Sequence, residues 1–179
     1  ALSVEDESES VSKTLEYAYD DWCIAQVSKF LGYESDYASY MNRSQSWKNL
    51  FDSESKFIRP KKNGDFLSPF DPYEVNNNFT EANAWQYTFF VPQDIPGMVN
   101  AYGGVAQFEN KLDSLFNAKT KTSGRDQADI TGLIGQYAHG NEPSHHIAYL
   151  YHTIGKPTKK KEKTHQILNE FYHIARLKL

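Results

Sequence analysis

The 179-residue sequence has a single cysteine, no long apolar run and no excess of basic residues. With Cys23 alone, no intramolecular disulfide can form, so an apolar core has to hold the fold together. No run approaches the roughly 18 apolar residues of a membrane-spanning helix, and we therefore expect no membrane partner. The 19 basic and 23 acidic residues give a net charge of −4. Because nucleic acid requires a basic surface, we expect no nucleic-acid partner either.

Aromatic residues are abundant instead, with 12 tyrosines, 11 phenylalanines and 3 tryptophans. Tyrosine and tryptophan combine an apolar ring with a polar group, which suits both sugar sites and large helical cores. The composition by itself favours the core.

The sequence predicts an all-α fold, because apolar residues recur at spacings of three and four along most of its length. This period indicates helices over residues 11–31, 34–51, 79–91, 105–118, 143–153 and 158–177. Gly32 and the short connection after it predict that the first two helices form an antiparallel pair. Asp94 is expected to cap a further helix that ends at Tyr102. No segment indicates a strand, and residues 52–78 read as a long loop rich in proline and asparagine.

Polar residues are concentrated in HGNEPSHH, residues 139–146, where a helix is expected to begin. Asn141 and Pro143 suit the cap and first turn of a helix, and this structural role would account for the motif by itself. A helix N-terminus also presents free N–H groups. Glu142, His145 and His146 would lie on one side of that helix, so a convergent site is the alternative.

The residue types in this motif favour calcium over zinc. Two adjacent histidines point about 100° apart on a helix and rarely share one zinc ion. Calcium prefers carboxylate, amide and carbonyl oxygen atoms, which Asn141 and Glu142 supply.

A second candidate site lies in TEANAWQY, residues 80–87. Glu81 is flanked by Phe79 and by the aromatic residues Trp85 and Tyr87. A carboxyl group in apolar surroundings has a raised pKa and can hold a proton near neutrality, which a general acid requires. An exposed loop carboxylate is the alternative reading.

Four parts of the sequence together resemble glycoside hydrolase family 92, the calcium-dependent, exo-acting α-mannosidases. These parts are SVSKTLEYAYDDW, TEANAWQYTFFVPQDIPG, GRDQADITGLIGQYAHGNEPSHHIAYLY and the closing helix. The resemblance extends from about Ser10 to His173. It implies that residues 1–179 are part of an (α/α)6 toroid built from antiparallel helix pairs, in an enzyme where a β-sandwich domain precedes the toroid.

The resemblance also implies a chemistry and a set of residues. Family members hydrolyse terminal α-linked mannose of glycans with inversion, and a calcium ion holds the sugar hydroxyls. Glu81 would be the general acid, with Glu142 as the alternative. Asn141 and Glu142 would lie at the calcium ion. The residues expected to bind the sugar are Trp85, Gln86, Tyr87, His145 and His146.

The sequence departs from the family in one respect that affects activity. The family's GN-x-D-x-GQ segment, which supplies the general base, has no counterpart in these 179 residues. We therefore expect this chain by itself to be inactive, because no group activates the water. A non-catalytic module that binds calcium or carbohydrate is the alternative.

Two further expectations concern the surroundings of the chain. A partial toroid would leave apolar faces open, so we expect self-association through them. The family is usually secreted or periplasmic, although the acidic first ten residues show no signal peptide.

Overall fold

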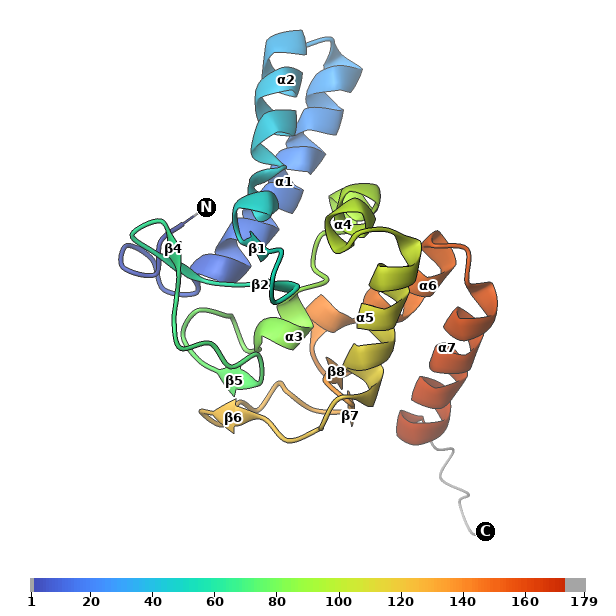
Figure 1. Cartoon of the computed structure of the whole chain (residues 1–179). Coiled ribbons are helices and arrows are strands. Elements are labelled where there is room, and N and C mark those ends of the chain that lie inside the picture. Colours follow the sequence, from blue (N-terminus) through green and yellow to red (C-terminus); the bar gives the residue numbers. More distant parts are fainter. Residues whose placement is uncertain (1, 173–179) are drawn as a thin grey trace, which may run out of the picture.

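The computed structural model describes residues 2–172. Within them the α helices are α1 (Ser10–Leu31), α2 (Glu34–Arg43), α3 (Ala84–Tyr87), α4 (Ile95–Tyr102), α5 (Val105–Asn117), α6 (Leu150–Thr153) and α7 (Pro157–Phe171). The 3-10 helices are η1 (Ser46–Asn49), η2 (Pro92–Asp94), η3 (Glu142–Ser144) and η4 (Ile147–Tyr149). Figure 1 shows that α1 and α2 lie side by side and project away from α5, α6 and α7.

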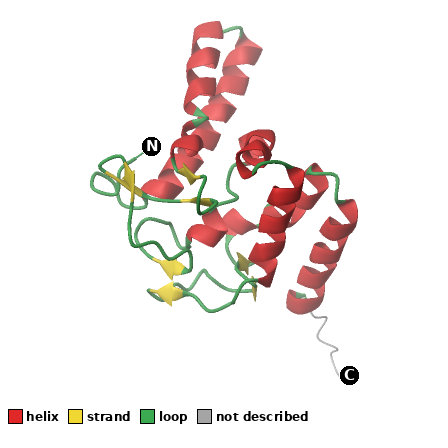
Figure 2. Cartoon of the chain, in the orientation of Figure 1, coloured by secondary structure: helices red, strands yellow, loops and turns green. Residues whose placement is uncertain are grey.

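Short strand pairs between the helices overturn the expected all-α fold. Residues 2–172 contain the strands β1 (Phe51–Asp52), β2 (Phe57–Ile58), β3 (Lys61–Lys62), β4 (Asp65–Phe66), β5 (Glu74–Val75), β6 (Ser123–Gly124), β7 (Leu133–Ile134) and β8 (Tyr137–Ala138). They form four two-stranded sheets, of which β5–β6 is parallel and the others are antiparallel. The fold is therefore mixed α/β, with the strands in the segments that connect the helices (Figure 2).

The β3–β4 hairpin has a local cause that is visible in the sequence. Asn63 and Gly64 connect the two strands, with φ angles of 52° and 89°. A two-residue hairpin turn of type I′ needs positive φ at both of these positions, and an Asn-Gly pair supplies it. The expectation that residues 52–78 contain no strand is therefore wrong.

The β5–β6 pair has a long-range cause instead. It joins segments about 50 residues apart, with Val75 paired to Gly124. Gly124 has a φ of 82°, and a Cβ atom there would lie 2.4 Å from the carbonyl oxygen of Val75. Only glycine fits this approach, so the pairing depends on a residue that has no periodic pattern around it.

The antiparallel pair of α1 and α2 is confirmed. Gly32 ends α1 in the left-handed conformation, with a φ of 79°. No residue of α2 is buried, and α1 exposes several large apolar side chains, of which Phe30 is 86% exposed.

Other predicted helices are correct only in part. The helix predicted over 34–51 ends at Arg43, and that predicted over 79–91 contains only the four-residue α3. The segment 143–153 is not one helix, because η3, η4 and α6 divide it between them. Asp94 does cap α4, since its Oδ1 accepts a hydrogen bond from Gly97 N at 3.0 Å. The last predicted helix is confirmed by α7 up to Phe171, and its residues 173–177 lie outside the described residues.

The aromatic residues fill the core, as the composition favours. The side chains of Tyr87, Phe89, Phe108, Tyr137 and Tyr151 are all buried. At the edge of this core, Asp113 of α5 accepts hydrogen bonds from Tyr151 of α6 at 2.8 Å and from Lys159 of α7 at 2.6 Å. One carboxylate therefore connects the three helices on this side of the molecule.

No helix within residues 2–172 combines the length and the hydropathy that crossing a membrane demands.

Candidate active site

The two polar motifs of the sequence meet in the fold, although 60 residues separate them. The side-chain amide of Asn141 donates a hydrogen bond of 2.9 Å to the backbone carbonyl of Glu81. Asn141 is the N-cap residue of η3, yet its side chain makes no capping hydrogen bond to that helix. With 4% exposure it is buried between the two loops, which it joins.

Glu81 has an unusual backbone conformation. Its φ of 52° lies in the left-handed region, which a residue with a β-carbon rarely adopts. The neighbouring residues are fixed by distant partners. Thr80 N donates to Ser12 Oγ at 2.8 Å, and Asn83 Nδ2 donates to Gln136 Oε1 at 2.8 Å. The turn is thus held by α1 and by the segment 136–141.

The surroundings of Glu81 differ from the expected apolar enclosure. Its side chain is exposed, whereas Phe79 before it and Ala82 after it are buried. The left-handed turn therefore presents the carboxyl group at the surface of residues 2–172. The proposed proton donor is accessible, and the described residues do not surround it with apolar groups.

Trp85, Gln86 and Tyr87 lie in α3 and face inward. Trp85 packs edge-on against Phe57, with the ring centroids 4.7 Å apart. The Nε1 atom of Trp85 and the Nε2 atom of Gln86 are buried without a hydrogen-bond partner among the described residues. Tyr87 points toward α1, where its hydroxyl donates to Glu16 at 2.8 Å, and burial raises the pKa of Tyr87.

A lysine that the sequence reading did not select lies against Trp85. Lys111 Nζ is 3.2 Å from the centroid of the Phe57 ring and 4.6 Å from that of Trp85. Burial lowers the pKa of Lys111 to about 7. The aromatic rings favour the charged ammonium by about 2 kcal/mol or more in a desolvated contact, which opposes this effect. Among residues 2–172 no carboxylate lies within salt-bridge distance of it.

The histidines of residues 139–146 diverge instead of sharing one helical face. His146 Nε2 donates to the carbonyl of Phe89 at 2.7 Å. Burial lowers the pKa of His146, although the hydrogen bond to that carbonyl opposes the effect. His145 is exposed, and its Nε2 donates to the carbonyl of His139 at 3.0 Å. Because His146 turns inward and His145 outward, the expected cluster with Glu142 does not form.

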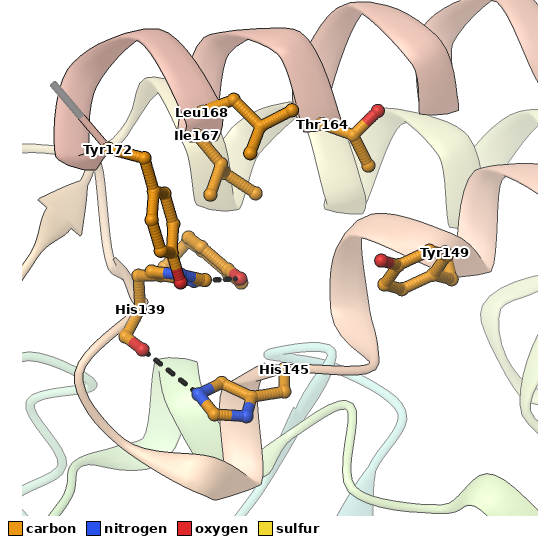
Figure 3. Close-up of a pocket in the computed structure, with 8 residues that line it drawn as sticks. His139, His145, Tyr149, Thr164, Ile167, Leu168 and Tyr172 are labelled. Carbon is orange, nitrogen blue, oxygen red and sulfur yellow. Dashed lines mark hydrogen bonds between the residues drawn. The ribbon is translucent and has the colours of Figure 1, made fainter. Parts of the chain in front are cut away.

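His145 borders a cavity between the 139–149 segment and α7 (Figure 3). The cavity has a volume of about 320 Å³, and its lining residues are Tyr137, His139, His145, Tyr149, Thr164, Ile167, Leu168 and Tyr172. Both ring nitrogens of His139 are occupied, since they lie 2.9 Å from the hydroxyls of Tyr137 and Tyr172. Burial and the neighbouring His145 lower the pKa of His139.

The calcium ligands that the sequence predicts are only a part of what the ion needs. The hydrogen bond to Glu81 uses Asn141 Nδ2, and no hydrogen bond among the described residues uses its Oδ1, the oxygen that a cation would need. Glu142 next to it is exposed. Calcium takes six to eight oxygen ligands, so these two side chains fit the ion without completing its shell. No three His, Cys, Asp or Glu side chains gather at a metal-binding distance within residues 2–172.

Sequence reasoning missed the residues that support these loops. Gln136 is fully buried and binds Asn83, but a lone glutamine between glycine and tyrosine gives no signal. The sequence does hold a signal for three residues that line the cavity beside α7. Their spacing of four places Thr164, Leu168 and Tyr172 on one face of the last predicted helix.

Comparison with known proteins gives the family. The sequence profile described as "Glycosyl hydrolase family 92 catalytic domain" matches residues 2–176. A protein of Arthroderma benhamiae, named "Uncharacterized secreted glycosidase", is 29% identical to the chain over an alignment of 181 positions. The alignment covers 87% of this chain and 21% of that protein.

Two solved structures are also similar to the chain. One is a family GH92 α-mannosidase of Bacteroides thetaiotaomicron in complex with mannoimidazole, with 42% identity and a TM-score of 0.85 over 95% of this chain. The other is a GH92 inverting mannosidase of the same organism, with 32% identity and a TM-score of 0.80 over 93% of this chain. The chain spans 23% and 24% of these two proteins. Since the family profile matches nearly its whole length, the chain belongs to glycosyl hydrolase family 92.

Proposed function

We propose that the chain contributes the general acid and part of the sugar site of an inverting, exo-acting α-mannosidase that removes terminal α-linked mannose from glycans. The similarity to two α-mannosidases supports the substrate class. One observation carries the proposal for the site. The hydrogen bond from Asn141 to Glu81 brings the loop with the candidate acid and the loop with the candidate calcium ligands together.

The chemistry follows from the positions of these side chains. Glu81 presents its carboxyl group at the surface, where it would protonate the leaving glycosidic oxygen. Glu142, which is also exposed, is the alternative acid. Asn141 Oδ1 and Glu142 would hold a calcium ion, which would supply positive charge to the 2- and 3-hydroxyls of mannose. His145 is accessible to a sugar, whereas the inward His146 would act by supporting the loop.

The inward residues of α3 have a role consistent with this site. Trp85 and Gln86 each bury an N–H group that lacks a partner among the described residues. A buried donor without an acceptor is costly, so we propose that a substrate hydroxyl or an ordered water binds there. Tyr87 would shape the pocket from behind.

Hydrolysis needs a group that these residues do not provide. Inversion requires a second carboxylate that activates water on the far side of the sugar. No carboxylate is assigned to this role within residues 2–172. We therefore propose that the 179 residues act as part of a larger catalytic domain and are inactive alone. We also propose that the enzyme is exported, on the basis of its similarity to a protein named as secreted.

Binding of simple glycosides tests the proposal. In the presence of calcium, methyl α-mannoside should bind more tightly than methyl α-glucoside, which differs only at the 2-hydroxyl. Product analysis on an α-linked mannose disaccharide should show no released mannose. Equal binding of the two glycosides would contradict a mannose site. Released mannose would contradict the proposed inactivity of the chain alone.

A further inference from the structure

The backbone of Glu81 is held in a conformation that its side chain does not favour. In the left-handed region the β-carbon crowds the following carbonyl oxygen, and glycine or asparagine is the usual occupant. Glutamate at a φ of 52° is therefore an outlier. Such outliers persist only where surrounding contacts impose them, and they concentrate at functional sites.

The contacts around the turn differ in how close they come to Glu81. Ser12 binds Thr80 before the turn, and Gln136 binds Asn83 after it. Among the hydrogen bonds of residues 2–172, the bond from Asn141 is the one that reaches Glu81 itself. It fixes the carbonyl oxygen, and therefore the peptide plane that follows Glu81. The flanking contacts fix where the turn lies, and Asn141 fixes how its central residue is oriented.

Asn141 is also committed to this contact at the expense of a more common one. An asparagine at an N-cap position ordinarily accepts a hydrogen bond from its own helix. At η3 that bond is absent. The side chain is buried and directed across the two loops. Its placement is therefore explained by Glu81 and not by the stability of η3.

We propose that Asn141 is a positioning residue that holds Glu81 in the left-handed conformation and thereby directs its carboxyl group outward. The proposal rests on the proposed function in one respect, because it takes Glu81 as the acid. It adds a second role to Asn141, whose Oδ1 would hold the proposed calcium ion while its Nδ2 orients the acid. Binding of the ion and orientation of the proton donor would then depend on one side chain.

Backbone chemical shifts of Glu81 test the proposal without any measurement of activity. In Asn141→Ala, the Cα, Cβ and carbonyl signals of Glu81 should move from left-handed values toward those of a right-handed or averaged backbone. In the matched control Asn100→Ala, which removes an exposed asparagine of α4, they should stay in place. A merely structural role for Asn141 would lower stability but leave these signals unchanged, and that result would overturn the proposal.

A measurement on the unmodified chain covers the case in which Asn141→Ala does not fold. A scalar coupling across the hydrogen bond should connect Asn141 Nδ2 to the Glu81 carbonyl carbon. Absence of the coupling in a folded, assigned sample would overturn the proposal. Lack of mannoside binding would count against the proposed function and would leave this inference intact, because neither experiment contains a sugar.

Discussion

The ring of His146 is connected to the carbonyl of Phe89 by a hydrogen bond of 2.7 Å, which ties the histidine motif to the core. His146 Nε2 has to carry the proton in this contact, because a carbonyl only accepts. The ring of His146 also packs edge to face against the ring of Phe90, with the two ring centroids 5.8 Å apart. A residue that appeared in the sequence as a candidate sugar ligand therefore anchors the loop from within.

This contact predicts a loss of stability in acid. Burial, the larger effect, lowers the pKa of His146 in the folded state below its ordinary value of about 6.5. The unfolded chain then takes up the proton first as the pH falls, so stability is complete above about pH 6.5 and decreases below it. His146→Gln should reduce the difference in unfolding free energy between pH 7.5 and 5.5, measured by urea denaturation.

The exposed His165 of α7 provides the control for this experiment. His165→Gln should keep the pH dependence of the unmodified chain. The same pH dependence in His146→Gln would show that the protonation of His146 is not linked to folding.

The lowered pKa of Lys111 predicts a second dependence of folding stability on pH, above pH 7. Because its folded-state pKa is about 7 and the ordinary value is 10.5, the unfolded state binds more protons between these values. Stability should therefore rise as the pH increases from 7 to 9. Lys111→Met should remove part of this rise and increase stability at pH 7, because it replaces a buried unpaired charge with an apolar group. Lys161→Met, at an exposed position of α7, should change neither quantity.

The strain at Glu81 predicts that glycine stabilises the chain there. Glu81→Gly should raise the unfolding free energy by about 0.5–1 kcal/mol, since relief of the left-handed conformation exceeds the entropy that glycine adds to the unfolded state. Glu162→Gly, in the right-handed interior of α7, should instead lower it by about 1 kcal/mol. Destabilisation by Glu81→Gly would show that the conformation is not strained.

The apolar surface of α1 predicts self-association. Phe30, Val27 and Tyr17 are 86%, 58% and 52% exposed, which is unusual for one helix of a monomer. Light scattering should therefore give a mass above that of one chain, and Phe30→Asp should lower it. Leu168→Ser, at a position of α7 that is 52% exposed, should leave the mass unchanged. A monomeric unmodified chain would contradict this prediction.

The elements that the sequence predicted correctly have local causes. The helix α1 with its Gly32 terminus, the apolar period of α5 and the Asp94 cap all act within a few residues and are confirmed. The apolar face predicted for α1 is confirmed only in part, because Leu15 and Ala18 are buried whereas Phe30 is exposed.

The strands were missed because a strand of two residues is too short to show a period, and the local Asn63-Gly64 turn between β3 and β4 was not recognised. The β5–β6 pair in particular depends on Gly124 meeting a segment about 50 residues away.

The candidate site shows the same division. Residues Glu81 and Asn141 could be selected by type and by family resemblance, but their hydrogen bond across 60 residues could not be read from spacing. The inward orientation of Trp85, Gln86 and Tyr87 also could not be predicted from the sequence, because a four-residue helix is too short to show an apolar face. The histidine pair was misplaced because α-helical geometry was assumed where η3 and η4 occur.

Calcium titration by calorimetry, with and without mannose, tests the central claim most directly. The account predicts that calcium binds the unmodified chain more tightly when mannose is present. Glu142→Ala should abolish this binding, whereas Glu162→Ala, at an exposed position of α7, should preserve it. Binding that survives Glu142→Ala, or no calcium binding by the folded chain, would contradict the claim that residues 141–142 hold the ion beside Glu81.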